Sequence, residues 1–169
     1  MKNSILKFGS YGALLGGGIF VVSHYLFSNI NFDTLEIFGY ASIIGSLSFI
    51  YFGIKHYRDK ENNGIVSFGK AIVIGLAISA IVGLTIGILD VIYVVYINPN
   101  FSAEYVQFTL EKARETMSLQ NFEVHKAKLL EDMKFFDNPA FSGLFMFAIV
   151  FSFGIIATLI SSFILQRKN

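Results

Sequence analysis

Apolar residues are gathered in four long runs, at about 6–27, 35–54, 71–97 and 140–165, which together cover most of the chain. About 20 apolar residues are needed for a helix to cross a bilayer, because a helix rises about 1.5 Å per residue and the hydrocarbon core is roughly 30 Å thick. Each run is about that long. The pattern therefore predicts an all-α, polytopic membrane protein with four transmembrane helices, forming a single domain over residues 1–169.

The polar segment between the third and fourth runs has the spacing of two amphipathic helices. One face is formed by Val106, Leu110, Ala113 and Met117, and a second by Phe122, Leu129, Met133 and Phe136. Ser118 stands where it can cap the second helix. We therefore expect an extracytoplasmic helical hairpin over about 99–137. Its apolar faces can contact each other, the membrane surface or a protein partner.

The same tetrapeptide pattern, Asn-Pro-x-Phe, stands on both sides of this segment, at 98–101 and at 138–141. Asn can accept hydrogen bonds from the free N–H groups of a first helical turn, and Pro is tolerated at the first helical position. Each copy is predicted to begin a helix, the first in the hairpin and the second at the fourth span.

Basic residues are distributed unevenly along the chain. They precede the first span, lie between the second and third, and follow the fourth, whereas residues 98–138 have five basic and seven acidic side chains. Because positive charge marks the cytoplasmic side, both termini and the 55–70 loop are expected in the cytoplasm of a bacterial inner membrane. The loop residues are candidates for contact with lipid headgroups or with a cytosolic partner: Lys55, Arg58, Lys60 and Lys70.

The third span has a stripe of small residues at four-residue spacing: Gly75, Ser79, Gly83 and Gly87. Such stripes allow two helix backbones to approach closely in lipid. Packing against another span of the same chain is the first interpretation, and homodimerisation is the alternative. Ile78, beside the stripe, is expected to face lipid.

Asp90 is the acidic residue that lies well inside a predicted span, and it falls on the face of the small-residue stripe. Carboxylates in membrane spans are costly and are candidates for function. Asp90 and the nearby Tyr93 are therefore a candidate intramembrane polar site. Since Asp90 lies towards the end of its span, a structural hydrogen bond is the alternative to a proton or ion role.

Composition narrows the remaining possibilities. Hydrophobic residues make up 54% of the chain and the net charge is +1, which gives no reason to expect nucleic-acid binding. There is no cysteine, and the three histidines are scattered without the spacing of metal ligands. No nucleophile motif or phosphate loop is present. We expect no enzyme activity, no cofactor and no metal site.

Three segments around the second and third spans are similar to a known family: FGYAS at 38–42, FGIKHYRD at 52–59 and NGIVSFGKA at 63–71. The chain resembles the DUF4199 family, small four-span membrane proteins found chiefly in Bacteroidetes, over nearly its whole length. The resemblance implies the four-span architecture and an inner-membrane location, and it implies no activity because the family has none established.

Together these features favour a membrane protein of unknown biochemical activity that acts as a non-catalytic subunit or interaction protein. Packing faces and an amphipathic outer segment are present, while catalytic constellations are absent. The alternative is a small transporter or ion-coupled carrier using Asp90, and a third hypothesis is an enzyme acting on lipid.

Overall fold

The computed structural model describes residues 1–26 and 32–167, with side chains for 1–23 and 32–167. Within these residues, four helical rods are long and apolar enough to cross a membrane: Lys2–Ser23, Phe32–Glu61, Phe68–Ile97 and Pro139–Leu165. The prediction of an all-α membrane protein with four spans is confirmed. Phe27, where the first span was predicted to end, lies outside the described residues.

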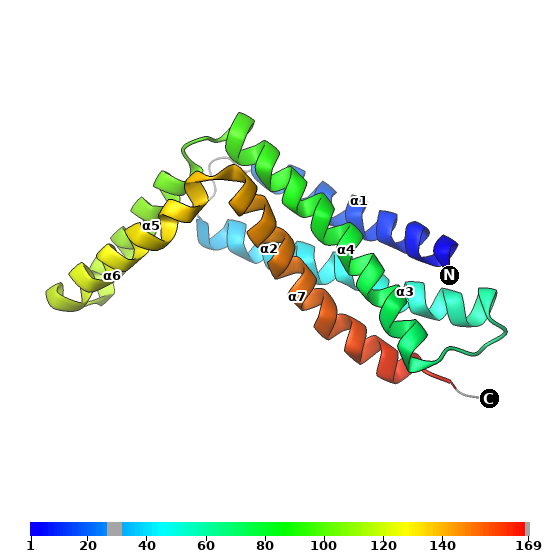
Figure 1. Ribbon diagram of the computed structural model, residues 1–169. Helices are drawn as coiled ribbons and strands as arrows, with labels where there is room; N and C mark the ends of the chain where they lie inside the picture. The colour runs from blue at the N-terminus through cyan, green and yellow to red at the C-terminus, as the bar shows by residue number, and fades with distance from the viewer. Residues whose placement is uncertain (27–31, 168–169) are drawn as a thin grey trace.

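The rods are built from the following elements (Figure 1). The first rod is α1 (Lys2–Leu26). The second consists of α2 (Phe32–Leu47), α3 (Phe49–His56) and the π-helical turn η1 (Tyr57–Glu61). The third consists of α4 (Phe68–Ile92) and the π-helical turn η2 (Tyr93–Ile97), and the fourth is α7 (Pro139–Leu165). Between the third and fourth rods lie α5 (Phe101–Thr116), α6 (Leu119–Met133) and the 3-10 turn η3 (Lys134–Asp137).

The central helix of the bundle is α4, which packs against α1, α3 and α7. One side of it is a row of branched side chains that are at most 2% exposed: Ile74, Ile78, Val82 and Ile86. These side chains fit against glycines of the neighbouring rods, Ile78 against Gly53 and Val82 against Gly12. The expectation that Ile78 faces lipid is wrong, because α4 is covered by other helices on two sides.

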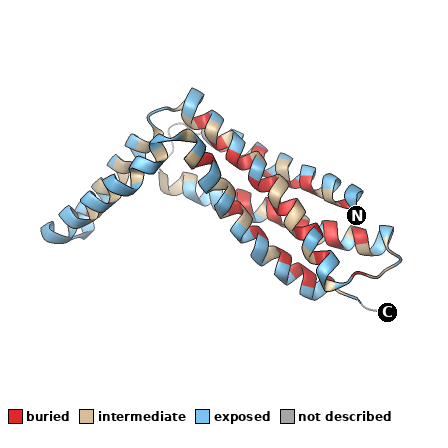
Figure 2. Cartoon of the chain, in the orientation of Figure 1, coloured by how far each residue is buried: buried red, intermediate tan, exposed pale blue. Residues whose placement is uncertain are grey.

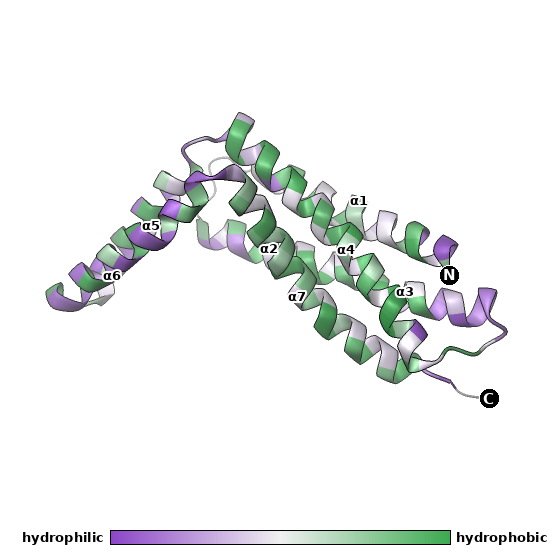
Figure 3. Cartoon of the chain, viewed as in Figure 1, coloured by the Kyte–Doolittle hydropathy of each residue, from purple (hydrophilic) through white to green (hydrophobic). Residues whose placement is uncertain are grey.

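The rods of the bundle consist mostly of hydrophobic residues, as expected for helices that cross a membrane (Figure 3). Large hydrophobic side chains such as Leu14, Ile44 and Phe163 are more than two-thirds exposed. Within the bundle, most buried residues lie on the sides of the rods that face one another (Figure 2).

The two Asn-Pro segments begin helices differently. Asn138 caps α7 as predicted, since its side-chain oxygen accepts from the N–H of Ala140 and Pro139 is the first helical residue. At the other segment the Asn98 side chain accepts from the N–H of Asn100, and α5 begins only at Phe101. Ser118 occupies the residue before α6, but its side chain makes no capping hydrogen bond there.

Helices α5 and α6 lie side by side and project from one end of the bundle towards one side (Figure 1). We call this end the hairpin end, and the opposite one, where both termini lie, the terminal end. In this hairpin Ala113 is buried, and Val106, Phe122 and Leu129 are half-buried.

Two groups of aromatic rings join the hairpin to the bundle. The Phe32 ring at the start of α2 lies 5.7, 5.9 and 5.1 Å from the ring centroids of three α5 residues, Phe101, Tyr105 and Phe108. The Lys112 ammonium lies 2.6 Å from the Asp33 carboxylate beside them. At the other end of the hairpin sequence, after α6, the Phe136 ring of η3 packs edge to face against Phe141 and Phe145 of α7.

Candidate functional site

Asp90 lies at the contact between α4 and α7, near the hairpin end. Its side chain is 9% exposed, and the Ser142 hydroxyl of α7 donates a hydrogen bond of 2.6 Å to Asp90 Oδ2. A hydrogen-bond donor at a fixed position offsets part of the cost of burying a polar group where water is scarce. The arrangement therefore pairs the buried carboxylate with a neighbouring helix.

Close backbone approach makes this hydrogen bond possible. A Cβ atom placed on Gly87 would lie 2.6 Å from the carbonyl oxygen of Gly143, and one on Gly143 would lie 2.8 Å from the carbonyl oxygen of Gly87. The two glycines, one turn before Asp90 and next to Ser142, let the backbones meet at the level of the polar pair.

All four residues of the predicted stripe on α4 face α7. A Cβ atom on Gly75 would lie 2.5 Å from Thr158, and one on Gly83 would lie 3.0 Å from Phe147. Ser79 lies against Gly154, and its hydroxyl donates to the Gly75 carbonyl at 2.8 Å. The stripe is thus covered by a helix of the same chain.

Two other hydroxyls of α7, those of Thr158 and Ser162, lack the hydrogen bond that the Ser142 hydroxyl makes. Thr158 and Ser162 are fully buried, and within the described residues neither Thr158 Oγ1 nor Ser162 Oγ has a hydrogen-bond partner. A buried polar group without a partner costs free energy. The α4–α7 contact therefore has a satisfied polar pair near the hairpin end and unsatisfied hydroxyls near the terminal end.

Tyr93 lies one turn beyond Asp90, at the start of η2, and is 8% exposed. Its ring packs edge to face against Phe20 of α1 and Phe101 of α5, at centroid distances of 6.2 and 5.5 Å. The Tyr93 ring therefore connects the bundle to the root of the hairpin.

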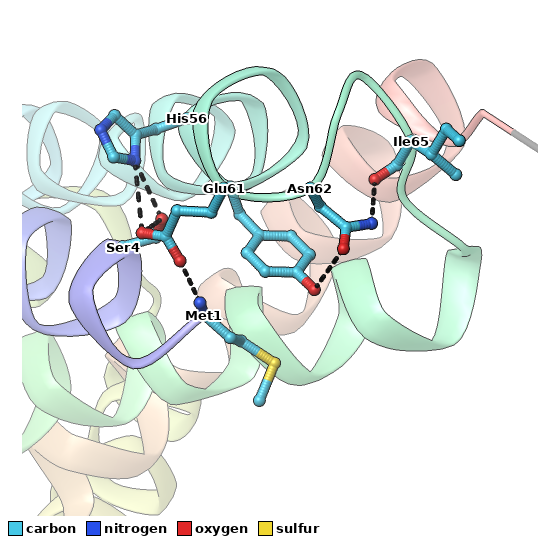
Figure 4. A network of polar contacts seen from close by, with 7 residues as sticks. Met1, Ser4, His56, Glu61, Asn62 and Ile65 are labelled. Carbon is cyan, nitrogen blue, oxygen red and sulfur yellow. Dashed lines mark hydrogen bonds and ion pairs between the residues drawn. The ribbon is translucent and has the colours of Figure 1, made fainter.

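A polar network closes the terminal end of the bundle (Figure 4). The Ser4 hydroxyl of α1 donates to Glu61 Oε1 at 2.8 Å and lies 2.9 Å from His56 Nδ1. Because the single Ser4 proton is given to Glu61, His56 Nδ1 must be the donor in the second bond. Glu61 also contacts the amino group of Met1. The network fastens α1 to the end of the second rod.

The four basic loop residues have two different environments. Arg58 is paired with Asp59 at 2.6 Å and reaches the Leu165 carbonyl of α7 at 3.4 Å, beside a short antiparallel bridge between Val66 and Arg167. Lys55, Lys60 and Lys70 are exposed. Arg58 thus holds the loop against α7, and the three lysines are available to headgroups or to a partner.

The hairpin has a groove of about 440 Å³ between α5 and α6. Its apolar lining includes Val106, Leu110 and Phe122. Its charged lining consists of two acidic and two basic side chains: Glu111, Arg114, Glu123 and Lys126. The Arg114 guanidinium lies 6.0 Å from the Phe122 ring centroid, within the range of a cation–π contact.

Among the side chains of residues 1–23 and 32–167, no group of three His, Asp or Glu is arranged to hold a metal ion. The comparisons with known proteins agree with the resemblance. A family described as "Protein of unknown function (DUF4199)" matches residues 7–167. The chain belongs to the DUF4199 family. No curated protein and no solved structure matches this DUF4199 member.

Sequence reasoning missed the partners of two polar residues in this DUF4199 protein. Ser142, which holds Asp90, lies 52 positions away and is one serine among several in the fourth span. Ser4 and His56 likewise come from different rods. The signal that could have found Ser142 is its neighbour Gly143, since a small residue at a helix contact marks where a short polar side chain can reach across.

Proposed function

We propose that this protein is a non-catalytic interaction protein of the membrane, which presents the α5–α6 hairpin to a protein partner. The observation that carries the proposal is the groove between the two helices, with an apolar lining and charges of both signs. An amphipathic helix that carries charges beside its apolar face would fill such a groove.

The exposure of the hairpin supports this proposal. Helix α6 has no buried residue over its 15 positions, and Leu119 and Val124 are 82% and 68% exposed. Exposed apolar surface that forms a contiguous patch marks a site of interaction with a protein or a membrane. The aromatic rings at both legs hold the hairpin against the bundle, so the groove is presented in a defined orientation.

Photo-cross-linking in native membranes tests the proposal. Benzoylphenylalanine is placed at Gln107, which lines the groove, or at Gln120, which is exposed on α6 and does not line it. We expect one defined protein adduct from position 107 and none from position 120. In the Gln107 probe background, the double variant Glu111→Lys with Arg114→Glu should reduce the adduct at least about tenfold, because it reverses two groove charges.

An adduct of equal yield from both positions, or an adduct that the charge reversal leaves unchanged, would show that the groove is not the recognition surface. Adducts with lipid from position 107 would mean that the hairpin lies on the bilayer instead.

We also propose that the protein lies in the bacterial inner membrane with both termini in the cytoplasm. The basic residues at the terminal end support this orientation, since six of them flank the first three spans. The chain has no cysteine, so single cysteines can be placed at Ser118 and at Asn62. An impermeant thiol reagent added to intact spheroplasts should label position 118 and not position 62. The reverse pattern would invert the orientation.

A second candidate function is an ion-coupled carrier that uses Asp90. It is supported by the burial of a carboxylate within a membrane span. The hydrogen bond from Ser142 favours the first proposal, because it gives the carboxylate a structural role. Asp90→Asn keeps the shape and an acceptor oxygen. A pH-dependent flux in proteoliposomes that the parent has and the Asn variant lacks would favour the carrier.

A further inference from the structure

An apolar groove of about 340 Å³ lies on the surface of the bundle between α1 and α2, on the half nearer the hairpin end. Six residues of α1 and one of α2 line it: Leu14, Leu15, Gly18, Ile19, Val22, Ser23 and Phe38. Its volume is within the range of ligand sites, roughly 300–1,000 Å³. Ser23, the polar member, donates its hydroxyl to the Phe20 carbonyl at 2.9 Å, so this proton is already used within α1.

Gly18 lies in the middle of the α1 lining and contributes no side chain to the groove. A Cβ atom on Gly18 would have no neighbour within 4 Å, unlike one on Gly12 or Gly16 of the same helix, which contact the second and third rods. Among the residues that the structure describes, Gly18 therefore makes no helix contact. It leaves a gap between Leu14 and Val22, one turn before and one turn after it.

These neighbours decide which occupant fits. A second copy of the helix would need a small residue one turn away on at least one side of the glycine for two backbones to approach. Leu14 and Val22 prevent that approach, and they make the gap about one side chain wide. The lining residues of α1 run from Leu14 to Ser23. This distance is roughly 14 Å along the helix axis, at about 1.5 Å per residue. A narrow apolar groove that runs along a membrane-spanning helix has the shape of one hydrocarbon chain.

We propose that this groove binds one acyl chain of a bilayer phospholipid as a defined site, distinct from the surrounding lipid. The span that forms most of the groove crosses the membrane, so the groove opens to phospholipid chains along its length. This site lies in the bundle and does not depend on the function proposed for the hairpin.

The absence of tryptophan from the chain allows a direct test. Phe38→Trp places a single fluorophore at the groove, and the purified protein in detergent is titrated with phosphatidylcholine brominated on its acyl chains. We expect saturable quenching at one lipid per chain. Gly18→Leu in this background should raise the lipid concentration for half-quenching at least about tenfold, which corresponds to about 1.4 kcal/mol, because the new side chain fills the gap.

The matched control is Gly39→Leu, on α2. Gly39 also has nothing within 4 Å of its Cβ position among the described residues, but it does not line the groove. This variant should titrate like the parent. Gly18→Ala adds a smaller side chain and can be tested if the Leu variant fails to fold. It should raise the lipid concentration for half-quenching by less than Gly18→Leu does.

Three results would overturn the proposal. Quenching that does not saturate would mean only general solvation by lipid, and equal shifts in the Gly18 and Gly39 variants would place the bound lipid elsewhere. A dimer of the parent by light scattering, lost in Gly18→Leu while quenching is unchanged, would assign the groove to a second copy of the chain.

Discussion

The bundle and the hairpin are both helical, but they are held together in different ways. In the bundle, Ile74, Ile78 and Val82 are fully buried, and glycines on facing helices allow the contacts. In the hairpin, α5 has one buried residue, Ala113. Helix α6 has no buried residue. The bundle therefore depends on complementary shape along its whole length, whereas the hairpin depends mainly on its attachment to the bundle.

The largest effect is expected where the bundle backbones meet. Gly87→Leu must push α7 away, because its Cβ atom would lie 2.6 Å from a backbone oxygen that cannot move alone. Overpacking of this kind costs about 1–3 kcal/mol or more. Unfolding by a denaturing detergent, followed by circular dichroism, should show the loss. Gly39→Leu, with open space around it, and Leu119→Ala on the hairpin should unfold like the parent. Equal stability of all three would remove the distinction between the two regions.

A second prediction compares hydroxyls within the bundle. Ser142→Ala removes a donor from the buried Asp90 carboxylate and should destabilise the fold by about 1–3 kcal/mol. Thr158→Val removes a hydroxyl that has no partner within the described residues and keeps the shape of the side chain. It should leave the free energy of unfolding equal or raise it. If Thr158→Val lowered the free energy of unfolding more than Ser142→Ala does, the Thr158 hydroxyl would have to make a stabilising hydrogen bond.

The third prediction concerns the root of the hairpin. Phe32→Ala removes ring contacts with Phe101, Tyr105 and Phe108, each worth about 0.5–1.5 kcal/mol. We expect the hairpin to move relative to the bundle while the bundle remains folded. Spin labels at Ile44 and Gln120 should give a broader distance distribution than in the parent.

Its control is Phe153→Ala, at a residue of α7 that is 42% exposed on the bundle surface. This variant should keep the parent distribution. An unchanged distribution in Phe32→Ala would mean that the α6 leg alone fixes the hairpin.

The smallest effect is expected at the ion pair beside Phe32. Asp33 raises the pKa of Lys112 through a hydrogen bond, so the pairing is present at neutral pH and is lost as the pH rises through the pKa of Lys112 in the folded protein. Both side chains are about half exposed, and such pairs are screened by salt. Lys112→Gln should therefore leave thermal unfolding at neutral pH almost unchanged. A clear fall in the unfolding temperature of Lys112→Gln at physiological salt would mean that this ion pair contributes more to holding the hairpin than the aromatic rings do.

Much of the fold could be predicted because the bilayer restricts the choices. A span must be a long apolar helix, so the runs of apolar residues located all four rods, and Asn138 and Pro139 located the start of α7. The candidate sites were harder. Asp90 stood out as a carboxylate in an apolar run, but its partner Ser142 did not, because serines are common in spans and only the fold brings this one near.

The spacing of apolar and small residues was enough to identify the segments that enter the membrane and the face of α4 that could approach another helix. It did not show that α7 covers the stripe, that Ile78 is buried or that Gly18 borders open space, which follow from the packing of the helices. The physical reason is that helix periodicity assigns a residue to a face, while the neighbour of that face depends on how the other helices pack.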